Sequence, residues 1–402
     1  MAEGFDVLVG DQSNDRMEML KAFDETKAGV KGLTDLGLPK IPKIFVRPSE
    51  ELAEELPHKN THKIQVPVID LSGVFQDADR RRQIVEEVRI ASETSGFFQV
   101  VNHGVPLSVL DGMIEGVREF NEQDVEEKKK YYSRDRTRNV RFNSSYDLFT
   151  SRTASWRDSL TISFSGPDET DPQDLPPPCR ISAVEYSKHM EILGNTLLGL
   201  LSEGLGLKTD HLKNMECSQG HRLHCHYYPA CPEPELAIGT TKHSDAGFLT
   251  ILLQNQITSG LQVLCQGQWI DIHPVLGGLV VNIGDLLQPP CCAQQHKGQD
   301  ITRATGVLSR AMLSNPTCRE LVSNGKFRSN EHRAITSRIG PRISVACFFS
   351  GPVNGAKIYG PIEELISKEN PAMYKEVVLS EYVQKFFATA LEKYRALDDY
   401  KV

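Results

Sequence analysis

The chain has 402 residues, a formal net charge of −8 and 24% charged residues, values that are ordinary for a globular protein. The acidic balance gives no reason to expect a nucleic-acid or anionic-membrane partner, and no apolar run approaches the roughly 20 residues that span a bilayer. The N-terminal residues lack a basic segment followed by an apolar one, so we expect no secretory signal. Nine scattered cysteines without a CxxC pair favour reduced thiols and a cytoplasmic location.

Residues 1–65 predict an N-terminal helical and extended segment. The stretch MLKAFDETKAGVKGL (19–33) has the character of a helix, and the prolines of LPKIPKIFVRP punctuate the extended part that follows. Next, VPVIDLS (66–72) predicts a short strand. RRRQIVEEVRIASETSG (80–96) has apolar residues at helical spacing and ends at a glycine, so it predicts a helix.

The rest of the segment 66–180 continues this mixed pattern. FFQVVNHGV (97–105) predicts a strand and a turn, and residues 106–132 predict a second helix. A proline-rich connector (169–179) leads into a long amphipathic helix within 181–220. The apolar stripe of that helix predicts a packing face for the core, formed by Met190, Leu193, Leu197, Leu200 and Leu201.

From residue 221 the period becomes strand-like. Short β-prone runs alternate with Gly, Pro and Asn turns: RLHCHYYP, FLTILLQ, GLQVLC, QWIDIHP, LVVNIGD and RISVACFF. Several strands at this spacing predict a β-sandwich or barrel over 221–351. Residues 352–402 predict a C-terminal helical segment, with a flanking helix in 371–395.

His243-Ser244-Asp245 is the first candidate for chemistry. In an extended strand, residues i and i+2 point to the same face, so the imidazole and the carboxylate should converge. Two histidines and one carboxylate on one face suit a non-haem Fe(II) ion and leave positions open for other ligands. An isolated His-x-Asp pair is more often a solvated pair, so the motif needs a third ligand.

A third ligand is available downstream. His332 is followed ten residues later by Arg342, and Ser344 lies on the same strand face as Arg342. A guanidinium binds a carboxylate with two parallel hydrogen bonds, and a neighbouring hydroxyl adds another donor. An arginine alone is usually a surface ion pair. In this order, however, the residues are what a dicarboxylate needs if one end binds a metal and the other end binds Arg342.

Longer motifs carry a resemblance to a known family. HYYPACPEPELAIGTTKHSDAGFLTILLQ, GGLVVNIGDLLQ, EHRAITSRIGPRISVACFF and IYGPIEELISKENP resemble the plant 2-oxoglutarate/Fe(II)-dependent dioxygenases, in particular the subgroup of 1-aminocyclopropane-1-carboxylate oxidase homologues. VPVIDLS, SGFFQVVNHGVP and ASWRDSL are similar to the N-terminal domain of that family. The resemblance implies a mainly β fold with flanking helices around a double-stranded β-helix (jelly roll). It also implies an N-terminal dioxygenase domain (66–180), a backing helix (181–220) and a catalytic core (221–351).

The resemblance also implies roles for single residues. His243, Asp245 and His332 would be the iron ligands, and Arg342, Ser344 and Tyr228 would bind 2-oxoglutarate. His226 stands where the broader family has asparagine, which places it near the cosubstrate. His224 and His226 could form a second metal site, but a packed or solvated His224 is the preferred interpretation. We interpret His103 as structural and Asp285 as a cap or turn residue.

Residues 289–320 depart from the family pattern. His332 lies 89 residues after His243, and without these 32 residues the separation of 57 is close to the family spacing. We interpret the segment as a translated intron or gene-model error, with a genuine surface loop as the alternative. Pro289 and Pro290 would break the helical turn expected after GDLLQ and displace His332.

The predicted function is therefore oxidation of a small specialised metabolite in a plant. Fe(II) and 2-oxoglutarate would serve hydroxylation, desaturation or demethylation, with molecular oxygen as a reactant, succinate and CO2 as co-products and ascorbate as a reductant. The chain is expected to be a monomer. The alternatives are an ascorbate-dependent ethylene-forming oxidase, a dioxygenase-like protein impaired by the insert, and a non-catalytic ligand-binding protein.

Overall fold

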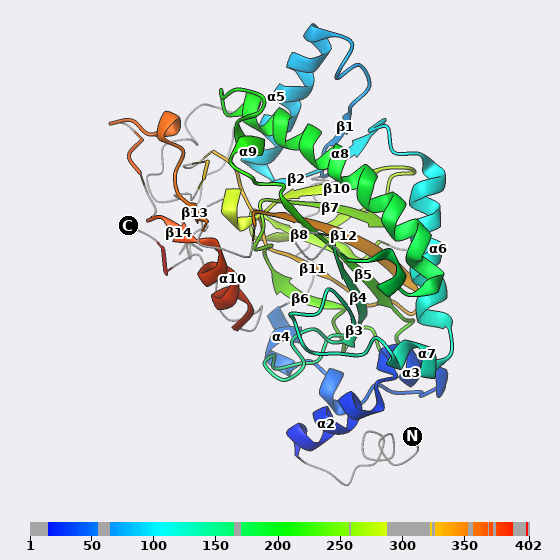
Figure 1. Cartoon of the computed structure of the whole chain (residues 1–402). Helices are drawn as coiled ribbons and strands as arrows, with labels where there is room; N and C mark the ends of the chain where they lie inside the picture. The colour runs from blue at the N-terminus through cyan, green and yellow to red at the C-terminus, as the bar shows by residue number, and fades with distance from the viewer. Residues whose placement is uncertain are drawn as a thin grey trace.

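The computed structural model describes residues 15–54, 65–164, 170–256, 259–287, 322–323, 326–352, 357–368, 370–372, 375–388 and 399–400. Two β-sheets face each other, and helices cover the outer side of the larger one (Figure 1). The predicted jelly roll with flanking helices is therefore confirmed. The segment 289–320 lies outside the described residues, and the predicted division into domains stays a prediction.

The larger sheet orders its strands β1-β2-β10-β7-β12-β5-β4-β3, and the smaller one β6-β11-β8-β9. Neighbouring strands are antiparallel, except that β1 and β2 are parallel. The strand bounds of the larger sheet are β1 (Val68–Asp70), β2 (Phe97–Val101), β3 (Val140–Ser144), β4 (Asp158–Ser163), β5 (Gly220–Tyr228), β7 (Leu249–Gln254), β10 (Leu279–Ile283) and β12 (Arg342–Ser350). Those of the smaller sheet are β6 (Thr240–His243), β8 (Leu261–Cys265), β9 (Gln268–Ile272) and β11 (His332–Ala334). A separate ribbon pairs β13 (Ile358–Tyr359) with β14 (Val377–Val378).

Each face of the larger sheet has its own chemistry, because side chains alternate along a strand. One face packs against the helices in the main core cluster and is apolar: Leu223, Cys225, Tyr227, Leu249, Ile251, Leu253, Leu279, Val281, Ile283, Ile343, Val345, Cys347 and Phe349. The residues between them face the smaller sheet and are mostly polar: Arg222, His224, His226, Tyr228, Thr250, Leu252, Gln254, Val280, Asn282, Arg342, Ser344, Ala346 and Phe348. The inner face thus brings polar groups to the space between the sheets.

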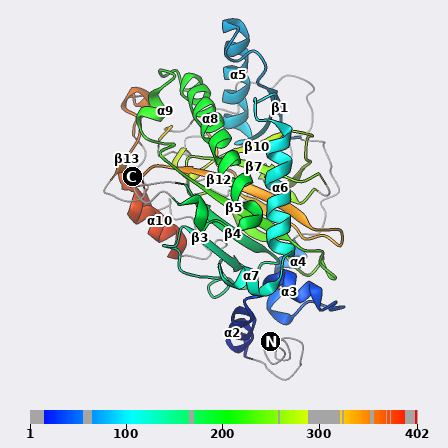
Figure 2. The ribbon, with the colours of Figure 1, turned by 45° about the vertical axis from the view of Figure 1, so that its right-hand side comes forward.

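The main helices pack on the apolar face. In Figure 2, α6 and α8 cross the same face of the larger sheet, and α5 contacts α8 at one end. Their bounds are α5 (Ala78–Thr94), α6 (Leu107–Glu122), α7 (Val125–Lys129), α8 (Arg180–Gly204) and α9 (His211–Asn214). The single helix predicted for 106–132 is two helices, because Gln123 is extended and Asp124 begins α7 by accepting a hydrogen bond from the backbone N–H of Glu126.

The terminal segments add short helices around the two sheets (Figure 1). The helix predicted for 19–33 is divided into α2 (Arg16–Thr26) and α3 (Gly29–Asp35), because Lys27 adopts a left-handed conformation with φ of 53° and ends α2. α4 (Ser49–Glu54) follows, and α10 (Leu379–Ala388) forms part of the helix predicted for 371–395. Among the described residues, no helix is long and apolar enough to cross a membrane.

Candidate metal centre

Two histidines meet across a strand pair in the smaller sheet. His243 ends β6 and is the register partner of His332, which begins β11. The Nε2 atoms of His243 and His332 lie 3.7 and 3.5 Å from Asp245 Oδ1. One ligand atom from each of the three residues lies within 4.8 Å of the others, so the cluster can hold a metal ion. The displacement of His332 expected from the insert is not seen.

The expectation that His243 and Asp245 share one strand is wrong in one respect. β6 ends at His243, so Asp245 lies in the loop beyond the strand. Its carboxylate still turns toward the histidines, because two residues of the larger sheet bind its other oxygen. Thr250 Oγ1 and Asn282 Nδ2 each donate to Asp245 Oδ2 at 2.7 Å. Oδ1 is thereby directed at the histidines.

Backbone carbonyls orient both imidazoles. His243 Nδ1 lies 2.8 Å from the carbonyl oxygen of Thr241, and His332 Nδ1 lies 3.3 Å from that of Asn330. A proton on each Nδ1 satisfies these carbonyls and leaves the lone pair of Nε2 pointing into the cluster. The Nε2 atoms are therefore the atoms available to a metal ion.

Electrostatics favour the protonation states that bind a metal. Burial and the neighbouring His332 lower the pKa of His243 to about 3, so its imidazole is neutral at neutral pH. Burial alone would raise the pKa of Asp245, but the two histidines and the hydrogen bonds from Asn282 and Thr250 lower it below its usual value. Two imidazole nitrogens and one carboxylate oxygen are the donor set that suits non-haem Fe(II), so these residues fit that ion.

Arg342 lies on the inner face at the start of β12 and is only 4% exposed. Its Nη1 donates to Ser344 Oγ at 3.3 Å, and its Nη2 donates to Gln254 Oε1 at 3.1 Å. Arg342 Nε and Gln254 Nε2 are buried and have no hydrogen-bond partner in the part of the chain that the structure describes. Because buried donors are normally satisfied, these atoms mark a place for an acceptor such as a carboxylate.

Tyr228 is the register partner of Arg342 on β5, and the guanidinium carbon lies 5.0 Å from the centre of its ring. The phenol oxygen is 3.1 Å from Thr240 Oγ1. Burial raises the pKa of Tyr228, but the guanidinium groups of Arg157 and Arg342 outweigh burial and hold the pKa below its usual value. The tyrosine is therefore a polarised hydrogen-bond donor beside Arg342.

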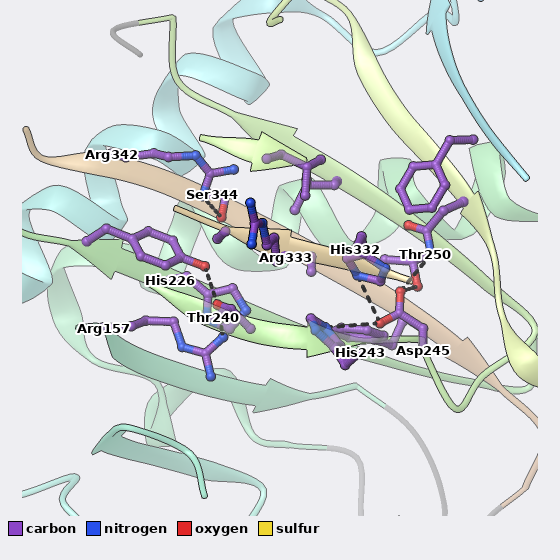
Figure 3. A pocket seen from close by; sticks show the side chains of 18 residues that line it. Arg157, His226, Thr240, His243, Asp245, Thr250, His332, Arg333, Arg342 and Ser344 are labelled. Atoms are coloured by element: carbon purple, nitrogen blue, oxygen red, sulfur yellow. Dashed lines mark hydrogen bonds and ion pairs between the residues drawn. The ribbon is translucent and has the colours of Figure 1, made fainter. Parts of the chain in front are cut away.

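One pocket connects the two groups. Figure 3 shows His243, Asp245 and His332 at one end and Arg342 and Arg157 at the other. The space between its walls, including the part open to solvent at its mouth, is about 480 Å³. Apolar side chains complete its walls and limit access of water: Phe97, Leu252, Leu261, Ala346 and Phe348.

The remaining candidate residues have structural contacts. His226 lines the pocket and its Nδ1 lies 2.9 Å from Ser159 Oγ. His224 packs against Phe348 with ring centres 4.9 Å apart, which agrees with the packing interpretation. The imidazole of His103 contacts the carbonyl oxygen of Gly277 through Nε2, at 2.8 Å.

Asp285 is a turn residue, as predicted, and its carboxylate also connects three segments of the chain. It begins the 3-10 turn Asp285–Leu287, and its carboxylate accepts hydrogen bonds from Ser244, Ser329 and Tyr382. It therefore joins the loop that carries Asp245 to the segment before His332 and to α10.

Sequence reasoning missed five residues of the site: Arg157, Thr240, Thr250, Gln254 and Asn282. The signal that could have found three of them is the alternation of β7 and β10, whose apolar runs are interrupted by a polar residue at every inner position but Leu252 and Val280. Arg157 precedes β4 and comes from a segment in which no metal motif occurs.

A jelly roll that holds two histidines and a carboxylate opposite a buried arginine defines a class of non-haem iron oxygenases. Residues 219–351 match the family model of the 2OG-Fe(II) oxygenase superfamily, and residues 66–180 match that of the N-terminal region of the non-haem dioxygenase in morphine synthesis. The chain therefore belongs to the 2OG-Fe(II) oxygenase superfamily and is a 2-oxoglutarate-dependent dioxygenase. The family resemblance predicted from the motifs is confirmed.

Individual relatives are similar over most of the chain. 1-Aminocyclopropane-1-carboxylate oxidase homolog 1 of Arabidopsis thaliana is 47% identical over 93% of each chain. Deacetoxyvindoline 4-hydroxylase of Catharanthus roseus is 43% identical over 95% of this chain and 88% of the relative. A crystal structure of JOX2 in complex with 2OG, Fe and JA is similar with a TM-score of 0.74 and 27% identity, over 93% of this chain and 97% of that chain.

Proposed function

We propose that this dioxygenase hydroxylates a small specialised metabolite, or desaturates or demethylates it, and releases succinate and CO2. His243, Asp245 and His332 hold Fe(II), and Arg342, Ser344 and Tyr228 bind the distal carboxylate of 2-oxoglutarate. The observation that carries the proposal is the three-residue cluster at one end of a pocket whose other end presents a buried, incompletely paired guanidinium.

Fe(II), when bound, supplies the activation of oxygen and the oxidative decarboxylation of 2-oxoglutarate. The side chains of the chain supply position. Arg342 and Ser344 hold one end of the dicarboxylate, so that its other end reaches the metal cluster. Thr250 and Asn282 keep Asp245 Oδ1 turned toward the histidines. The apolar walls keep water from the reacting groups.

The test compares the native protein with Arg342→Ala. With Fe(II) and 2-oxoglutarate, the native protein should form succinate, and anaerobic titration should show 2-oxoglutarate binding. Arg342→Ala should lose most of the succinate formation and most of the affinity for 2-oxoglutarate, because it removes the charged partner of the distal carboxylate. Arg338→Ala is the matched control, since this arginine lies on the surface beside Glu235 with 63% of its side chain exposed. Full turnover by Arg342→Ala would overturn the anchoring role.

One measurement distinguishes the ethylene-forming alternative from the proposed 2-oxoglutarate-dependent activity. Ethylene formed from 1-aminocyclopropane-1-carboxylate with ascorbate, in the absence of 2-oxoglutarate, would favour it over the proposal. Ascorbate as a reductant, the cytoplasmic location and the monomeric state stay predictions.

A further inference from the structure

Arg157 is a second buried guanidinium at the cosubstrate end of the pocket. It lies immediately before β4 and is 5% exposed. Asp158, the next residue, points to the opposite face and accepts hydrogen bonds from the backbone N–H groups of Val30 and Lys31. Arg157 therefore faces the pocket between the sheets, whereas the carboxylate of Asp158 lies on the other face. Its Nε is buried and has no partner among the described residues.

One hydrogen bond of Arg157 connects the two sheets. Its Nη1 donates to Thr240 Oγ1 at 2.7 Å, and Thr240 Oγ1 is 3.1 Å from the phenol oxygen of Tyr228. Thr240 begins β6 in the smaller sheet, and Tyr228 ends β5 in the larger one. Figure 3 shows Arg157 and Thr240 side by side at the same end of the pocket as Arg342.

The direction of these hydrogen bonds follows from proton counting. A guanidinium only donates, so Thr240 Oγ1 accepts from Arg157. Threonine and tyrosine each carry one hydroxyl proton. If Tyr228 donated to Thr240, its proton would be unavailable to a carboxylate. A hydroxyl that accepts from a cation becomes a better donor and a weaker second acceptor, which favours donation from Thr240 to Tyr228.

We propose that Arg157 and Thr240 are positioning residues that turn the proton of Tyr228 toward the distal carboxylate of 2-oxoglutarate. The sequence of donors runs from the Arg157 guanidinium to the Thr240 hydroxyl, then to the Tyr228 hydroxyl, and ends at the carboxylate. This inference rests on the proposed function, in which Arg342 and Tyr228 bind that group. It adds a residue from the N-terminal half of the chain to the cosubstrate site.

The test measures how strongly the protein prefers a distal carboxylate. Dissociation constants are determined anaerobically on Fe(II)-loaded protein for 2-oxoglutarate and for 2-oxopentanoate, which carries a methyl group in place of that carboxylate. Thr240→Val and Arg157→Met should each reduce the preference for 2-oxoglutarate about tenfold, as expected for one charge-assisted hydrogen bond. The double variant should lose less than the product of the two single effects, because both interrupt one donor sequence.

Two further variants complete the design. Arg157→Lys keeps a charged donor and should restore part of the preference. Arg338→Met removes a surface arginine and should leave the preference unchanged. Thermal unfolding of each variant confirms that the protein is folded.

Three results would overturn the inference. Equal weakening of both ligands would assign Arg157 and Thr240 a merely structural role. An unchanged preference in Thr240→Val would show that Tyr228 needs no donor. If the native protein prefers neither ligand, the anchoring of a distal carboxylate fails, and the proposed function fails with it; if it prefers 2-oxoglutarate and the variants keep that preference, only the donor sequence fails.

Discussion

The hydroxyl of Thr250 offers a direct test of how the fold prepares the metal centre. Thr250 on β7 and Asn282 on β10 are register partners, and both donate to the same oxygen of Asp245 at 2.7 Å. Both side chains are buried. With Oδ2 held in this way, Asp245 Oδ1 remains for the metal.

Thr250→Val keeps the shape of the side chain and removes one of the two donors. A hydrogen bond to a charged group contributes about 1.5–3 kcal/mol. Loss of a group that orients a metal ligand typically weakens metal affinity by about 10- to 100-fold, which corresponds to about 1.4–2.7 kcal/mol. The two magnitudes agree, so we expect the dissociation constant for Fe(II) to rise by that factor.

The assay is an anaerobic titration of Fe(II) against a competing chelator. Thr250→Ser keeps the hydroxyl and should retain most of the native affinity, which separates the lost hydrogen bond from a change in packing. Native affinity in a folded Thr250→Val variant would refute the reasoning, as would an equal loss in Thr250→Ser.

Three further predictions concern the cosubstrate site, the metal and pH. A Cβ on Gly260 would lie 2.8 Å from Arg342 Cδ, so Gly260→Ala should displace the guanidinium and weaken 2-oxoglutarate binding by roughly tenfold or more, with Fe(II) affinity unchanged in the chelator titration. Fe(II) at 100 times its dissociation constant should stabilise the fold by about 2.7 kcal/mol, measured as a rise in Tm that EDTA reverses; an unchanged Tm would count against the metal cluster. Burial lowers the pKa of His221 from 6.5 to about 4, so its contribution to stability is complete above pH 6.5 and falls by about 3 kcal/mol as the pH drops to about 4. Urea unfolding across this range should show that loss, and His221→Gln should show a smaller one; equal pH dependence in the two proteins would contradict the assignment.

The strands of the core could be predicted because their period is local. At the start of β12, Arg342 and Ser344 alternate with the apolar Ile343 and Val345, and this pattern separates the two faces there. The order of His243, Asp245 and His332 was likewise readable, since each lies in a recognisable motif.

The supporting residues could not be predicted because their roles depend on pairing between distant strands. Thr250 and Asn282 become neighbours only when β7 pairs with β10. Arg157 reaches Thr240 only when the two sheets face each other. A lone threonine, asparagine or arginine has no motif of its own, so sequence reasoning passes over it.

Polar side chains from the two sheets meet at both ends of the pocket, but the contacts at the two ends differ in kind. At one end, hydrogen bonds from the larger sheet hold Asp245, while His243 and His332 belong to the smaller sheet. An ion bound by all three residues would therefore connect the two sheets. At the other end, the hydrogen bond from Arg157 to Thr240 connects the two sheets directly. The two sheets are therefore linked by the chain's own side chains at the arginine end, whereas at the metal end the link would depend on a bound ion.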